Sequence, residues 1–275
     1  MSIVVGIDIG GSTTKIVGLS QNKIISPMLV KANDPVASIY GAFGKFLSAN
    51  QFQLSDIKRI MVTGVGSSHI TQSLYGIATG KVDEFHAIGK GGLFLTDLDR
   101  AIVVSMGTGT AFIIADHNGE KHIGGTGIGG GTLLGLSNKM LNIRHFEDLI
   151  EMAQDGSLSN VDLNISDITR DKLETLPPDI TASNFGKISD LATKADMALG
   201  IINLVFQTIG MFAVFASRIH QTNDVVLTGN LANVPQSRSI FDTLHALHNV
   251  NYHIPNHAEF ATAVGATLSS PREML

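Results

Sequence analysis

The sequence predicts an α/β protein made of two related domains, and three observations support this prediction. Residues 3–19 (IVVGIDIGGSTTKIVGL) run from an apolar strand through a turn of small residues into a second strand. Residues 101–116 (AIVVSMGTGTAFIIAD) repeat that plan, which indicates two units of common design. Residues 124–136 (GGTGIGGGTLLGL) then place seven glycines in thirteen residues, before an apolar helix that we expect to begin near Leu133.

Residues 1–98 are expected to form the first domain, with strands followed by helices. The apolar run at residues 3–9 is typical of a strand buried on both faces. Asp34 and Pro35 open a helix, because proline suits the first helical turn and apolar residues then recur at helical spacing. Further strands are expected at residues 14–20, 23–31 and 57–64, and further helices near residues 69–75 and within 81–95.

Residues 99–275 are expected to form the second domain, which begins with the repeated unit. After the glycine-rich segment, residues 135–152 are expected to be helical and residues 176–187 irregular. Residues 197–217 contain no charged residue and are expected to form a long helix. The remaining strands are expected at residues 120–123, 224–231 and 250–254, and the remaining helices at residues 239–247 and 260–268.

The uncharged helix is long enough to cross a membrane, but its pattern favours another interpretation. Small and polar residues recur along one of its faces, at Gly200, Asn203, Gln207 and Gly210. Such a face suits close packing against another helix, either in the core of a soluble protein or in a dimer. We therefore expect no membrane partner and a homodimer whose interface includes this helix.

Composition excludes several classes of function. The formal net charge is −5 and no cluster of Lys and Arg is present, which argues against a nucleic acid partner. The absence of cysteine excludes disulfides, thiolate zinc sites and cysteine nucleophiles, and it fits a cytoplasmic location. The first ten residues lack the basic region of a signal peptide.

The three glycine-rich turns together indicate a nucleotide phosphate site. Glycine lets the backbone approach a ligand closely, and the N–H groups at a helix N-terminus attract anions. Each turn alone is equally consistent with an ordinary loop. Asp8, the only charge in its strand, is costly to bury and is a candidate ligand for magnesium or its water, or else a turn residue that bonds nearby amides. Glu84 lies where a helix begins, as either a base or a cap.

Three familiar motifs are absent or out of context. Gly125, Gly127 and Gly130 satisfy G-x-G-x-x-G, but the residues before them are polar and turn-like, whereas a dinucleotide fingerprint follows an apolar strand. No P-loop motif is present. His253 and His257 are separated by Pro255, so we expect no structural metal site there.

Taken together, these segments resemble the actin-like ATPase and sugar kinase superfamily, with its two ribonuclease H-like domains, and more narrowly the bacterial type II pantothenate kinases. GIDIGGSTTK is similar to the first phosphate loop, VDEF to the catalytic-glutamate motif and MGTGT to the second phosphate loop. The glycine-rich segment, VDLNISDI and DITASNFG follow in the family's order. The resemblance covers nearly all of the chain and implies that ATP binds in the cleft between the two domains.

The resemblance implies roles for individual residues. Asp8 matches the aspartate that holds Mg²⁺ through water, and Glu84 matches the catalytic base. The positions that match the nucleotide site are Asp8, Gly10, Gly11, Ser12, Thr13, Thr14, Lys15, Thr108, Gly109, Gly130, Gly131, Thr132, Leu133, Leu134, Phe146, Gly229 and Asn230.

On the acceptor side, Thr181 and Ala182 match positions that reach the pantothenate pocket of the partner subunit. His122 stands where the family carries an arginine that grips the substrate's carboxylate. Histidine lacks the permanent charge and the bidentate fork of arginine, so this departure weakens the expectation of pantothenate itself. Lys121 and Arg144 are candidates to supply the missing charge.

The function that the resemblance implies is ATP-dependent phosphorylation of the primary hydroxyl of pantothenate to 4'-phosphopantothenate, the first step of coenzyme A biosynthesis. Two alternatives stay open. One is a kinase of the same fold acting on another small alcohol or an amino sugar. The other is a non-catalytic binding protein that responds to nucleotide or CoA, although such a protein has no need of a base.

Overall fold

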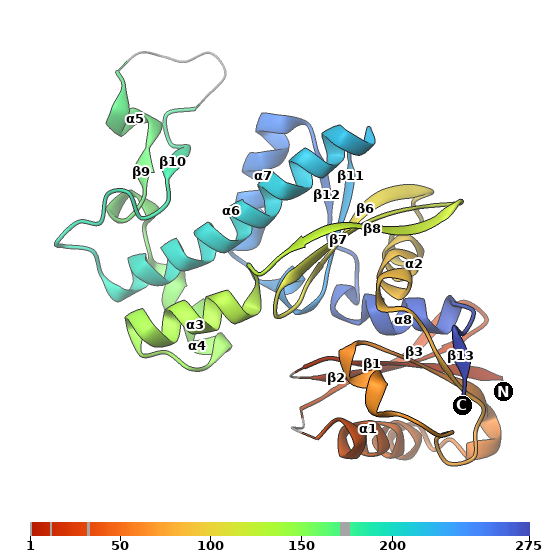
Figure 1. Cartoon of the computed structure of the whole chain (residues 1–275). Coiled ribbons are helices and arrows are strands. Elements are labelled where there is room, and N and C mark those ends of the chain that lie inside the picture. Colours follow the sequence, from red (N-terminus) through yellow and green to blue (C-terminus); the bar gives the residue numbers. More distant parts are fainter. Residues whose placement is uncertain (1, 12, 32–33, 171–176) are drawn as a thin grey trace.

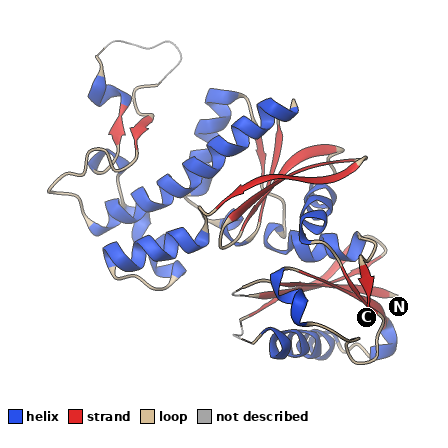
Figure 2. Cartoon of the chain, in the orientation of Figure 1, coloured by secondary structure: helices blue, strands red, loops and turns tan. Residues whose placement is uncertain are grey.

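The computed structural model describes residues 2–11, 13–31, 34–170 and 177–275, so the predicted site residue Ser12 lies outside the described part. Two mixed sheets with helices on their faces make up the chain (Figures 1 and 2). One sheet has the strand order β13-β5-β4-β1-β2-β3 and the other the order β12-β11-β6-β7-β8. The predicted α/β class with two related units is confirmed.

The first sheet consists of β1 (Ile3–Ile9), β2 (Thr14–Ser20), β3 (Lys23–Val30), β4 (Ile57–Thr63), β5 (Thr79–Lys81) and β13 (Glu273–Met274). The second consists of β6 (Arg100–Met106), β7 (Thr110–Asp116), β8 (Gly119–Thr126), β11 (Asp224–Thr228) and β12 (Asn251–His253). β1 pairs antiparallel with β2 and parallel with β4, and β6 pairs in the same way with β7 and β11. The repeat seen in the sequence is therefore a repeat of topology.

The helices cover both faces of each sheet. They are α1 (Pro35–Asn50), α2 (Glu84–Thr96), α3 (Gly130–Leu141), α4 (Phe146–Met152), α5 (Ile165–Ile168), α6 (Lys194–His220), α7 (Ser237–His248) and α8 (Ala261–Leu268). The first sheet lies between α1 and α8, and the second lies between α6 and α2. A small two-stranded sheet, β9 (Leu163–Asn164) and β10 (Thr181–Ser183), stands apart from both.

α2 and α8 join the two sheets through direct contact between their backbones. A Cβ atom at Gly265 would lie 1.8 Å from the carbonyl oxygen of Ala87, and one at Gly91 would lie 1.9 Å from that of Ala261. Only glycine permits this approach. Because α2 rests on the second sheet and α8 on the first, this crossing is where the two sheets meet. We propose that the domain boundary lies between residues 98 and 99, where the chain first leaves the first sheet. The end of the chain returns to that sheet, because α8 packs on it and β13 pairs with β5.

Two predicted helices differ from the structure. The helix expected near residues 69–75 is wrong: the chain forms a 3₁₀ turn at Val65–His69 and then an irregular segment in which Tyr75 and Gly76 have positive φ. The helix expected at residues 135–152 is two helices, because Asn142 adopts the left-handed conformation and ends α3. That helix also begins at Gly130, one turn before the expected Leu133.

The small-residue face of α6 packs inside the subunit, which corrects the expectation that it is a surface where two subunits approach. A Cβ atom at Gly210 would lie 2.2 Å from Leu244 of α7, and one at Gly200 would lie 3.0 Å from Val161. Asn203 is buried as well. By length and composition α6 could cross a membrane, but 61% of its apolar window is buried by the rest of the chain.

The α2–α8 crossing leads to a prediction about stability. Gly265→Ala should destabilise the protein by about 1 to 3 kcal/mol or more, since its methyl group would meet a backbone oxygen that cannot rotate away. Gly41→Ala in α1 is the matched control, because nothing lies within 4 Å of its Cβ position. It should be stabilising by about 0.5 to 1 kcal/mol. Urea unfolding measures both changes, and equal midpoints for Gly265→Ala and wild type would contradict the assigned contact.

Candidate active site

The turns of the two repeated hairpins face one cavity of about 590 Å³. The β1–β2 turn contributes Gly10, Gly11 and Thr13, and the β6–β7 turn contributes residues 107–109. A second cavity of about 410 Å³ shares four lining residues with the first: Thr13, Gly107, Thr108 and Asn230. The two cavities are therefore parts of one cleft between the sheets.

The glycine-rich segment holds the second turn in place. The N–H of Gly130 donates to Gly107 O at 2.9 Å, and the N–H of Gly131 donates to Thr108 O at 2.9 Å. A Cβ atom at Gly129 would lie 2.7 Å from Thr108 O, so the two segments need glycine in order to touch. These two amides are occupied within the protein. The segment thus shapes the cleft, and N–H groups for an anion must come from elsewhere in the two turns.

Asp8 and Lys15 form a buried pair at the first turn. They lie opposite each other on β1 and β2, with Lys15 Nζ 4.0 Å from Asp8 Oδ2. Burial raises the pKa of the Asp8 carboxyl, and Lys15 opposes this shift. Burial likewise lowers the pKa of Lys15, with Asp8 the strongest opposing influence. A cation placed beside Asp8 would stabilise its carboxylate, so this residue suits a magnesium ion or its water.

Glu84 is the first residue of α2, and it lines the larger cavity with Asp8 and Lys15. The helix cap is its neighbour: Asp83 Oδ1 accepts a hydrogen bond of 3.1 Å from the N–H of His86. The carboxylate of Glu84 is therefore not needed to begin the helix. Burial raises the pKa of Glu84, and the nearby charges of Asp8 and Asp83 act in the same direction. This is the pattern expected of a carboxylate tuned to accept a proton.

His122 reaches the same cavity from β8 and stacks on Phe85 of α2. The ring centroids are 4.0 Å apart and the planes differ by 12°. An adjacent pair between His86 Nδ1 and Glu120 Oε2 also ties α2 to β8. Residues alternate sides along a strand, so Lys121 points away from the cavity that His122 faces. Arg144 does not line either cavity.

The smaller cavity brings together several residues that resemblance had assigned to the nucleotide. Gly130, Gly131, Leu134 and Phe146 all line it. Gly109 and Gly229 line the larger cavity. Three assigned residues line neither cavity. Leu133 is wholly buried in the core. Thr132 Oγ1 caps α3 by accepting from the N–H of Gly129, and Thr14 Oγ1 hydrogen-bonds Ser38 Oγ.

Thr181 and Ala182 do not reach this cleft within one chain. They line a separate cavity of about 360 Å³ on the outer face of α6, together with Phe212 and Phe215. The buried Asp162 fixes their segment, because it accepts hydrogen bonds from Thr181 Oγ1, Asn184 Nδ2, Phe185 N and Asn203 Nδ2.

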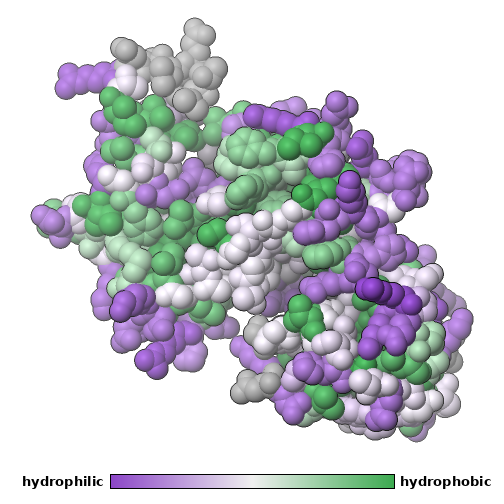
Figure 3. All heavy atoms as spheres, viewed as in Figure 1, coloured by the Kyte–Doolittle hydropathy of each residue, from purple (hydrophilic) through white to green (hydrophobic). Residues whose placement is uncertain are grey.

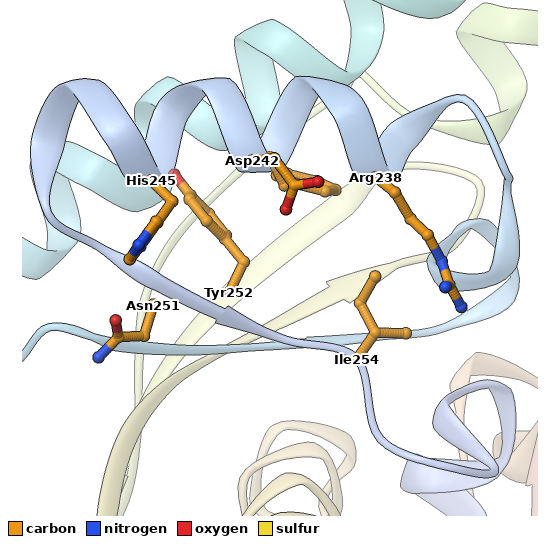
Figure 4. Close-up of a pocket in the computed structure, with 7 residues that line it drawn as sticks. Arg238, Asp242, His245, Asn251, Tyr252 and Ile254 are labelled. Carbon is orange, nitrogen blue, oxygen red and sulfur yellow. The ribbon is translucent and has the colours of Figure 1, made fainter.

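A further cavity of about 510 Å³ lies between α7 and β12, and Figure 4 shows its polar side chains. Arg238 and His245 stand at opposite ends of this groove. Tyr252 is committed to the fold, because its hydroxyl donates to Gly210 O at 3.0 Å. Neither hairpin turn lines this cavity, so we place the candidate active site in the interdomain cleft.

Sequence reasoning missed several residues that line the cleft: Val65, Phe85, Ile88, Thr262, Lys31, Glu147, Asn233 and Glu259. Phe85 belongs to the VDEF motif, and Ile88 follows Glu84 by about one helical turn, so the motif and the helix that it begins were usable signals. The others come from loops and helix ends whose place depends on how the two sheets meet.

A family model described as Fumble matches residues 100–269, more than half of the chain. The chain belongs to the Fumble family. The type II pantothenate kinase of Staphylococcus haemolyticus is 30% identical over 275 aligned residues, covering 95% of this chain and 98% of the relative. That of Oceanobacillus iheyensis is 32% identical, covering 79% and 84%. These relatives confirm the resemblance on which the site residues were first assigned.

Solved structures confirm the fold of this Fumble family member. The activator of 2-hydroxyisocaproyl-CoA dehydratase from Clostridium difficile, with bound ADPNP, superposes with a TM-score of 0.70 at 17% identity, covering 97% of this chain and 93% of the other. A ROK family glucokinase from Streptomyces griseus, with glucose and AMPPNP, gives 0.62 at 10% identity, covering 96% and 98%. The actin-like ATPase fold is thus confirmed.

The assignment of Asp83, and not Glu84, as the cap of α2 can be tested by measuring the free energy of unfolding. Asp83→Ala should lower the free energy of unfolding by about 0.5 to 2 kcal/mol, since it removes the side-chain acceptor that caps α2. Asp83→Asn should restore most of that loss, and Glu84→Ala should cost less. Urea denaturation measures all three. A larger loss for Glu84→Ala than for Asp83→Ala would show that Glu84 is the cap.

Proposed function

We propose that this protein is an ATP-dependent kinase that phosphorylates the primary hydroxyl of pantothenate, or of an alcohol built on it, in the cytoplasm. One observation carries the proposal: Glu84, a carboxylate with a raised pKa that is not the helix cap, lines the same cavity as both hairpin turns. The names of the relatives support the choice of acceptor.

ATP would lie along the cleft, with its base in the smaller cavity beside Leu134 and Phe146 and its phosphates between the two turns. Asp8 would hold Mg²⁺ through water, and the ion would supply neutralisation of phosphate charge. Lys15 adds a positive charge beside Asp8. Phosphoryl transfer depends mainly on positioning and on neutralising charge, and these are the tasks that the two turns and Lys15 can perform.

Glu84 would orient the acceptor hydroxyl and take its proton. The hydroxyl oxygen forms a bond to the γ-phosphorus, the bond from that phosphorus to the β–γ bridging oxygen breaks, and ADP leaves. Burial makes Glu84 a stronger base than an exposed glutamate, because it raises the carboxyl pKa. Phe85 and Ile88 place apolar surface beside the base and limit access of water to it.

Two other functions use the same fold. A kinase for a sugar is one, since a structural neighbour holds glucose with an ATP analogue. A non-catalytic nucleotide-binding protein is the other. The position of Glu84 favours an enzyme, because a binding protein gains nothing from a partly buried carboxylate that faces the phosphate turns.

Glu84→Gln is expected to lower kcat by about 10²- to 10⁴-fold, the usual contribution of a general base, with ATP affinity within a few fold of wild type. A coupled ADP-release assay measures turnover, and calorimetry with a nonhydrolysable ATP analogue measures binding. Glu151→Gln on the exposed side of α4 is the control and should be fully active. A Glu84→Gln variant with most of its kcat would exclude the base assignment.

We further propose that the protein is a homodimer formed by the outer face of α6. Phe212, Phe215 and Ile219 are 47%, 49% and 75% exposed on consecutive turns of this helix. Figure 3 shows apolar atoms gathered on the side where α6 runs in Figure 1. Exposed apolar patches of this kind usually mark contacts between proteins. The patch borders Thr181 and Ala182, which fits their expected role in the partner's acceptor site.

Replacing both Phe212 and Phe215 by serine should convert the dimer to monomer and abolish turnover together, since the interface and the shared site are adjacent. Sedimentation velocity at micromolar concentration measures the first effect and ADP release the second. Leu191→Ser is the control, because that leucine is equally apolar and 87% exposed but lies outside the patch. A wild-type protein that is monomeric and fully active would contradict the proposal.

A further inference from the structure

The charge balance of the larger cavity restricts the kind of acceptor that it can hold. Among the described residues that line it, the titratable side chains are Asp8, Lys15, Glu84 and His122. Lys15 is the one full cation in this set, and it is buried beside Asp8. Lys15 acts on both carboxylates, so Asp8 and Glu84 share this one cation. With both carboxylates ionised, the cavity carries net negative charge before any phosphate enters it.

His122 is poorly suited to offset that charge. An imidazole lacks the permanent charge of a guanidinium, and it offers single donors where a guanidinium offers a planar pair. One face of its ring is covered by Phe85. Lys121 points to the other side of β8, and Arg144 lies outside both cavities. An acceptor with a carboxylate near His122 would meet an aromatic stack instead of a fixed positive charge.

Part of the lining of the larger cavity is apolar and open to a ligand. Val65 is 68% exposed and Phe85 is 38% exposed, and both line the cavity with Ile88 and Ala111. Small-molecule pockets combine apolar walls with a few polar groups that fix orientation. A flat, uncharged amide or an alkyl chain can lie against such a wall without losing hydration of a charge.

We propose that the preferred acceptor is an uncharged amide or alcohol derivative of pantothenate, of the kind represented by pantetheine, and that pantothenate itself is a poorer substrate. This inference rests on the proposed kinase function and specifies its acceptor. His122 and Phe85 are then the residues that determine specificity, and Glu84 acts on the same hydroxyl in every case.

The test compares three acceptors that share the reacting hydroxyl and differ at the far end: pantothenate, pantothenol, in which a hydroxymethyl group replaces the carboxylate, and pantetheine. ADP release by the wild-type protein should give kcat/KM values for both neutral compounds that are at least about tenfold higher than the value for pantothenate. A tenfold ratio corresponds to a free-energy difference of about 1.4 kcal/mol. The difference should lie mainly in KM, because the base and the nucleotide are unchanged.

His122→Arg should raise kcat/KM for pantothenate by about tenfold or more and leave pantothenol within a few fold, since arginine can stack on Phe85 and also bind a carboxylate. Lys121→Arg adds no charge to the cavity and is the control. Pantothenate used as well as pantothenol by wild type would overturn the inference and leave the kinase proposal standing. No turnover of any of the three by protein that still binds an ATP analogue would overturn both.

Discussion

Contact between backbones sets the geometry of the cleft. Asp8 lies on β1 and Glu84 on α2, and α8 lies between these two elements. A Cβ atom at Gly6 of β1 would lie 2.0 Å from Ala263 O of α8, and one at Gly265 of α8 would lie 1.8 Å from Ala87 O of α2. No side chain fills either gap, so the spacing from β1 through α8 to α2 has almost no freedom to vary. The proposed base and the proposed metal-associated carboxylate are therefore held by three elements that touch directly.

Burial between the two sheets explains why a few ordinary residues acquire unusual properties. Asp8 and Lys15 are each less than a tenth exposed. Because water is excluded from both, the pKa of Asp8 is raised and the pKa of Lys15 is lowered, so burial favours the neutral form of each group. Glu84 is less buried, yet its pKa is raised, as is that of Asp8. Charge that arrives with a nucleotide and a metal ion would thus enter a site whose own groups are poorly solvated, where electrostatic interactions are strong.

Much of this arrangement could be predicted from sequence because it depends on local patterns. The two hairpins and the helix that begins at Glu84 follow from apolar runs and turn residues a few positions apart, and the strand before the glycine-rich segment follows from the repeat. Two features that could not be predicted, the packing of α6 and the contact of His122 with Phe85, depend on distant contacts. The partner of Gly210 is Leu244 on another helix, and the stack of His122 on Phe85 joins a strand to a helix from the other half of the chain. Neither pairing leaves a trace in local spacing.

The two faces of α6 show how one apolar helix can serve both a core and a surface. Gly200 and Gly210 let side chains of the same subunit approach closely, so the face is covered at these two positions. The opposite face keeps large side chains, and Phe212 and Phe215 lie next to the segment that Asp162 holds against the helix. A second subunit on that face would meet Thr181 and Ala182 at once. Packing of the glycine face thus fixes the direction of the aromatic face, and with it the place where a partner's acceptor site could be completed.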